Sequence, residues 1–71
     1  MSIVVIDKNG KEIKIKDFES AIKQGILSVE GITIVIRGSD GSERKIEKEF
    51  GQAIKDKDFV LEEGQVIVVV N

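Results

Sequence analysis

LEEGQVIVVVN, at residues 61–71, decides the fold because it contains one of two nearly continuous apolar runs in the chain. The other run is SIVVI at residues 2–6. A strand with one solvated face alternates apolar and polar side chains, whereas a strand in the middle of a sheet can be apolar on both faces. The two runs therefore predict two central strands, one from each end of the chain.

The first apolar run leads into a predicted hairpin. Residues 2–6 and residues 11–15 (KEIKI) flank DKNG, in which Asn9-Gly10 is typical of a two-residue turn that needs positive φ at both positions. That turn sets a register with the pairs Lys8–Lys11, Ile6–Ile13 and Val4–Ile15. Because directly paired residues share a face, we expect a core face made of Val4, Ile6, Ile13 and Ile15. The opposite face would then carry Ile3, Val5, Lys14 and Lys16.

A short helix is predicted within KDFESAIKQGIL at residues 16–27. Asp17 suits the N-cap position and Gly25 the position just after the last turn. The apolar side of this helix is expected to comprise Phe18, Ala21, Ile22 and Ile26. About two helical turns are unstable alone in water, so the helix must pack on the sheet.

The second half of the chain repeats this pattern of elements. GITIVIRG (31–38) predicts a strand, SDGS (39–42) a turn, and ERKIEKE (43–49) a polar edge strand with Ile46 facing inward. EFGQAIKDKD (49–58) predicts a second short helix or a 3₁₀ connection, although Gly51 disfavours a helix. QVIVVV (65–70) is the last strand, which completes the order ββαββ(α)β.

An internal similarity links the two helical segments. DFESAIK (17–23) and EFGQAIK (49–55) share Phe-x-x-Ala-Ile-Lys about 32 residues apart. Two ββα units of similar size could reuse one helix pattern, or half of the chain could be a duplicated or designed copy. An alternative architecture follows, in which two ββα halves close about a pseudo-two-fold axis into a small barrel.

The element order resembles that of β-grasp, or ubiquitin-like, domains, and residues 59–70 carry the more specific likeness. Soluble-ligand-binding β-grasp domains and sulfur-carrier proteins have a Leu-x-x-Gly-Asp-x-apolar-x-apolar signature, which here begins at Leu61 with Gly64 and with Gln65 in place of Asp. The resemblance implies an α+β fold with a mixed sheet, whose first and last strands are parallel, adjacent and central. The two apolar runs agree with that arrangement.

The sequence also departs from the ubiquitin-like pattern. Sulfur carriers and ubiquitin use a flexible Gly-Gly tail with a reactive carboxylate, whereas Asn71 directly follows the last predicted strand here. The resemblance therefore implies the fold and argues against conjugation or sulfur transfer.

Composition narrows the classes of function. The 71 residues predict a single domain (1–71) with neither Cys nor His, which removes disulfides, thiolate metal sites and the usual neutral-pH general base. Eleven Lys and Arg are mixed with 13 Asp and Glu, so nucleic-acid binding is not expected. No apolar run approaches a membrane span and no signal peptide is evident, so we expect a cytoplasmic protein. The absence of His, Cys, Trp, Tyr and Pro also fits a designed or simplified scaffold without biological activity.

No motif predicts catalysis, a cofactor or a metal. DKNGKEIKIKDF (7–18) lacks the Gly and Glu spacing of a calcium loop, and RGSDGS (37–42) lacks the Lys-Ser/Thr ending of a phosphate loop. The paired carboxylates, Glu62 with Glu63 and Asp56 with Asp58, lie among polar residues with lysines nearby. We expect solvated surface there, and no enzyme.

The sheet face opposite the first helix is the predicted functional surface. The resemblance at the Leu61 signature implies that Ile67 and Val69 face the helix. Strand alternation then places a mostly β-branched set on the opposite face, which is our candidate interface: Ile3, Val5, Thr33, Val35, Val66, Val68 and Val70. Monomers rarely expose such a patch without a use for it, so we expect a protein partner or a homo-oligomer. Two alternatives remain: residues 47–60 could fold across this face and cover it, or the domain could bind a small ligand.

Overall fold

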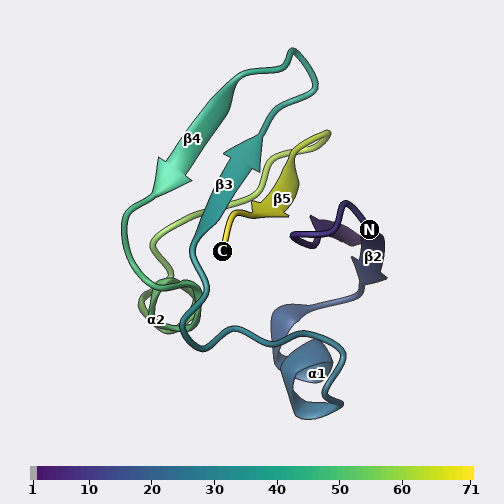
Figure 1. Ribbon diagram of the computed structural model, residues 1–71, viewed down its shortest axis with the longest axis vertical. Coiled ribbons are helices and arrows are strands. Elements are labelled where there is room, and N and C mark those ends of the chain that lie inside the picture. The colour runs from purple at the N-terminus through teal and green to yellow at the C-terminus, as the bar shows by residue number, and fades with distance from the viewer. Residues whose placement is uncertain (1) are drawn as a thin grey trace.

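The computed structural model describes residues 2–71, which form a single sheet with two short helices (Figure 1). The elements follow the predicted order: β1 (Ile3–Ile6), β2 (Glu12–Ile15), α1 (Phe18–Lys23), β3 (Ile34–Arg37), β4 (Glu43–Ile46), α2 (Phe50–Asp56) and β5 (Val66–Val69). The strand order across the sheet is β2-β1-β5-β3-β4. β5 pairs parallel with β1 and antiparallel with β3. The predicted α+β class and the parallel pairing of the first and last strands are confirmed.

The sheet is open, and the barrel alternative is wrong. β5 lies between the β1–β2 and β3–β4 hairpins, so that β2 and β4 form the two edges. A closed barrel would need these two edge strands to pair with each other, and β2 and β4 do not pair. The edge position predicted for the polar fourth strand is confirmed, and its charged side chains protect that edge from pairing with another chain.

The predicted register of the first hairpin is wrong by one residue. Asp7 donates its N–H to the Lys11 carbonyl (2.9 Å), and the Gly10 N–H bonds to the Asp7 carbonyl (2.9 Å), so the loop has three residues. Among the described non-glycine residues only Lys57 has positive φ, so the turn relies on Gly10 alone (φ +85°). The observed pairs are Ile3–Ile15, Val4–Lys14, Val5–Ile13 and Ile6–Glu12.

This one-residue difference exchanges the two faces of β1, because side chains alternate along a strand. Val5 is in the core with 1% of its surface exposed, and Ile3 packs against the core. Ile3 and Val5 therefore do not lie on the face opposite the helices, as the sequence predicted. Val4 and Ile6 lie there instead.

The core lies between the sheet and the two helices. The strands contribute Val5, Ile15, Ile34, Ile36, Ile46, Ile67 and Val69, and the rest of the chain contributes Ala21, Leu27, Val29, Phe50 and Ala53. The inward position predicted for Ile46 is confirmed. Ile22 and Ile26 are 38% and 50% exposed, so the predicted apolar side of α1 is only partly buried.

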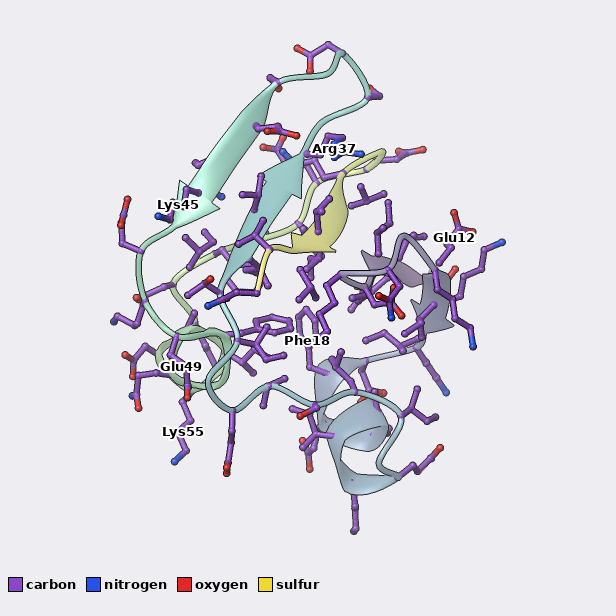
Figure 2. The ribbon with its side chains drawn as sticks, in the orientation of Figure 1. Glu12, Phe18, Arg37, Lys45, Glu49 and Lys55 are labelled. Carbon is purple, nitrogen blue, oxygen red and sulfur yellow. The ribbon has the colours of Figure 1, made fainter. Side chains whose placement is uncertain are left out.

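Residues 47–60 lie on the same side of the sheet as α1. The Phe18 ring on α1 contacts the Phe50 and Phe59 rings edge-on, at centroid distances of 5.8 and 5.9 Å. Phe50 is fully buried in this cluster, and Figure 2 shows Phe18 between the helices and the sheet. The alternative in which this segment covers the opposite face is therefore wrong.

The two helices are near copies of each other. Each begins at the Phe of the shared motif, and the residue before it, Asp17 or Glu49, accepts a backbone N–H three residues ahead. In each, the residue seven positions after the Phe has positive φ: Gly25 (+75°), which follows the C-cap Gln24 of α1, and Lys57 (+55°), which is the C-cap of α2. The repeated sequence motif thus corresponds to a repeated capping structure.

We expect Lys57→Gly to stabilise the domain by about 0.5–1 kcal/mol, because a lysine is strained in the left-handed conformation that glycine adopts freely. Gly25→Ala, at the matching position of α1, should destabilise by a similar amount. Thermal unfolding of the two variants and the wild type checks both signs. Equal melting temperatures for Lys57→Gly and the wild type would show that α2 gains nothing from a glycine stop.

Candidate interaction surface

The open face is the side of the sheet that points away from α1 and α2. Strand pairing arranges its side chains in two rows across the sheet, from β2 to β4. We define the first row as Lys14, Val4, Val66, Arg37 and Glu43. We define the second row as Glu12, Ile6, Val68, Val35 and Lys45. The second row has an apolar centre and a charged residue at each end. In the first row the apolar pair Val4 and Val66 lies between Lys14 on one side and Arg37 with Glu43 on the other.

Five apolar side chains form the centre of the open face: Val4, Ile6, Val35, Val66 and Val68. All five are part-exposed, and they come from the three central strands β1, β5 and β3. Val70 extends this centre along β5 and is 49% exposed. It stands beside Thr33, whose carbonyl accepts the Val70 N–H at 3.1 Å. These six residues therefore form a continuous apolar strip along the middle of the open face.

Most of the predicted interface residues lie on this strip. Strand alternation and pairing place Thr33, Val35, Val66, Val68 and Val70 on the open face as expected. The two from β1, Ile3 and Val5, are replaced by Val4 and Ile6. A predicted three-residue loop around Gly10, in place of the two-residue turn, would have placed Val4 and Ile6 on the open face.

The charged ends of the rows lie at opposite edges of the molecule, as Figure 2 shows for Glu12 and Lys45. Within the first row, Arg37 Nε lies 3.1 Å from Glu43 Oε2, and both side chains are about half exposed. Within the described chain, no ion pair or side-chain hydrogen bond involves Glu12, Lys14 or Lys45. An exposed ion pair contributes little to folding stability, and the other three residues form no ion pair within residues 2–71. These charges therefore contribute little to the free energy of unfolding.

Glu49 joins α2 to the loop before β3, away from the open face. Its carboxylate accepts the Gly31 N–H at 2.9 Å and the Gln52 N–H at 3.1 Å. These hydrogen bonds, first that from Gly31, lower the pKa of Glu49 below its ordinary 4.5. Glu49 therefore has a structural role as both a helix cap and a tie between segments distant in sequence.

We expect Glu49→Ala to lower the melting temperature at pH 7 and to matter less in acid. A carboxylate whose pKa is depressed by folding stabilises the protein above its unfolded pKa, and that stabilisation disappears as pH falls through the folded pKa. The difference from wild type should therefore shrink below about pH 4.5. Glu47→Ala, which removes a neighbouring exposed carboxylate, is the control. A difference that stays constant from pH 7 to pH 3 would contradict this role.

The predicted carboxylate pairs are arranged as surface groups. Lys48 Nζ lies 2.7 Å from Asp56 Oδ2 and 2.5 Å from Asp58 Oδ2. The hydrogen bond from Lys48 lowers the pKa of Asp56, which is the opposite of what a general acid at neutral pH needs. Glu62 and Glu63 are both exposed on the turn before β5.

A pocket of about 640 Å³ lies on the helix side of the molecule. Ile3, Phe18, Phe59 and Leu61 supply its apolar lining, and the exposed Lys16 is its cation. No polar or charged side chain is buried among the described residues. A small ligand there would meet apolar surface and solvated charges, and would not touch the open face.

Comparison with protein-family models, with curated proteins and with solved structures finds no match to this chain. Neither of the helices between residues 2 and 71 is long and apolar enough to cross a membrane.

Proposed function

We propose that the chain is a β-grasp domain that acts as a small non-catalytic protein-interaction module, with the open face as its binding surface. The order of the elements and the parallel pairing of β1 with β5 support the fold. The observation that carries the function is the apolar centre of the open face. A solvated sheet face ordinarily alternates to polar residues, whereas this one presents Val or Ile at five adjacent positions.

The shape of the open face favours a protein over a small molecule. Its five apolar residues belong to a single layer of sheet, and none of them lines the cavity on the helix side. Small ligands need a concave site that surrounds them, whereas an apolar centre with a charged rim is typical of a protein interface. The proposed partner is therefore another polypeptide with a complementary surface.

Photo-crosslinking in extract of the expressing cells tests this function. A benzophenone amino acid replaces Val35 on the open face in one protein and Lys23, an exposed residue of α1, in the control. We expect a crosslink to a defined polypeptide only from position 35. Excess wild-type protein should compete for it, and excess Val68→Lys protein should not. Crosslinks that are equal from both positions, or that Val68→Lys competes away as well as wild type, would contradict the proposal.

A further inference from the structure

We infer that the partner is a second copy of this chain, packed face to face through the open face about a two-fold axis that runs along β5. This inference rests on the proposed function, since it identifies the occupant of the same surface. The observation behind it is the order of charges at the ends of the two rows.

The charges at the four corners of the open face alternate in sign. In the first row, Lys14 stands on the β2 edge and Glu43 on the β4 edge. In the second row the signs are reversed, with Glu12 on the β2 edge and Lys45 on the β4 edge. A surface with this pattern is complementary to itself under particular rotations, because each corner can meet a corner of opposite charge.

A two-fold axis along β5 gives that complementarity. The rotation places β2 of one copy opposite β4 of the other. Each row then lies opposite the same row of the second copy. Lys14 then faces Glu43 of the second copy, and Glu12 faces Lys45 of the second copy. The symmetry repeats both contacts, so four pairs of opposite charges surround the apolar centre.

The same axis also covers the whole apolar strip. Val66 and Val68 of β5, together with Val70 just after β5, lie along the axis and stack on the same residues of the second copy. An axis across the strands would also match charges, but it places the first row over the second and leaves Val70 beyond the contact. An axis along the diagonal would set Lys14 against Lys14. The axis along β5 alone matches the charges and buries Val70.

The dimensions permit these contacts. Neighbouring strands lie about 4.8 Å apart and stacked sheets about 10 Å apart, so a lysine and a glutamate can meet across the gap between two sheets. The axis produces aligned strands, which is the common arrangement of two packed sheets. Five strands of four residues make a smaller contact than a standard stable interface, so we expect reversible association that rises with concentration.

Exchanging the charges on one edge tests the arrangement. The first variant, Glu12→Lys/Lys14→Glu, reverses the β2 edge, and the second, Glu43→Lys/Lys45→Glu, reverses the β4 edge. All four side chains are exposed, and each variant keeps the net charge of the wild type. In each variant alone, all four corner pairs become like-charged. In a mixture of the two variants, every corner pair is again opposite.

Sedimentation equilibrium from micromolar to millimolar protein supplies the measurement, with circular dichroism as the check that both variants fold. We expect the wild type to dimerise, each variant alone to associate about 10- to 100-fold more weakly, and the equimolar mixture to recover the wild-type affinity. The rescue by mixing is the decisive control, because two misfolded variants would not restore each other.

Three results would overturn the inference: a wild type that is monomeric throughout, variants that dimerise as the wild type does, or a mixture that fails to recover. The proposed function fails separately. A monomeric wild type that still gives a competed crosslink to another polypeptide from position 35 would retain the interaction surface and reject the second copy as its occupant.

Discussion

Val5→Lys should unfold the domain, whereas Val4→Lys, one residue earlier, should leave it folded. Val5 is 1% exposed and faces the core, so a lysine there would be buried without a partner at a cost of several kcal/mol. A domain of this size has a total stability of roughly 5 kcal/mol, so the cost of burying the lysine is enough to unfold it. Val4 lies on the open face, where a lysine can extend into solvent for about 1 kcal/mol or less.

Urea denaturation followed by circular dichroism measures both variants against the wild type. The comparison is well matched, because both substitutions replace the same residue type in the same strand. If Val4→Lys unfolded the domain and Val5→Lys did not, the first hairpin would have the two-residue turn instead of the observed three-residue loop.

Phe50→Ala should cost about 3–5 kcal/mol, which leaves a domain of this size barely folded at 25 °C. Phe50 is fully buried, and its ring packs against Phe18 on α1 and Phe59 in the segment before β5. The cavity left by the ring would border both helices and the sheet, so the surroundings can collapse only partly.

The control for this substitution is Phe59→Ala, which removes a ring that packs at the periphery of the core and is only partly buried. We expect a clearly smaller loss of stability from Phe59→Ala than from Phe50→Ala in the same urea titration. Equal losses, or a Phe50→Ala variant with the wild-type midpoint, would contradict the central position of Phe50.

The register of β1 could not be predicted from its own residues. Ile3 and Val5 would suit the core as well as Val4 and Ile6, and Ile13 and Ile15 of β2 face the core in either register. The choice is made by Asp7, whose carboxylate accepts the N–H groups of Asn9 (2.9 Å) and Lys11 (2.8 Å). Asn9-Gly10 alone is compatible with both loop lengths, so the whole face assignment of β1 depended on one aspartate.

The faces of β3 and β5 were predictable because residues in or next to these strands distinguish the core side from the solvated side. Thr33 and Arg37 alternate with the core residues of β3 and mark its solvated side, and the Leu61 signature placed Ile67 and Val69 toward the helices. Their pairing with β1 and β3 then placed Val66 and Val68 on the open face.

The position of α2 was not predictable in the same way. The spacing of Phe50 and Ala53 shows which side of the helix is apolar, but not which side of the sheet it covers. That side is set by contacts with the loop before β3, where the Phe50 N–H bonds to the Ile32 carbonyl at 2.7 Å and Glu49 accepts the Gly31 N–H. Such pairings between segments some 18 residues apart leave no local pattern in the sequence.

Val68→Lys tests most directly whether the chain associates with a second copy of itself through the open face. Val68 stands at the centre of the second row, between Ile6 and Val35, and is part-exposed. Sedimentation equilibrium and urea denaturation of the same samples should show that the variant loses association while its unfolding midpoint stays within about 1 kcal/mol of wild type. A wild type that stays monomeric at millimolar concentration, or a variant that associates as the wild type does, would contradict the account.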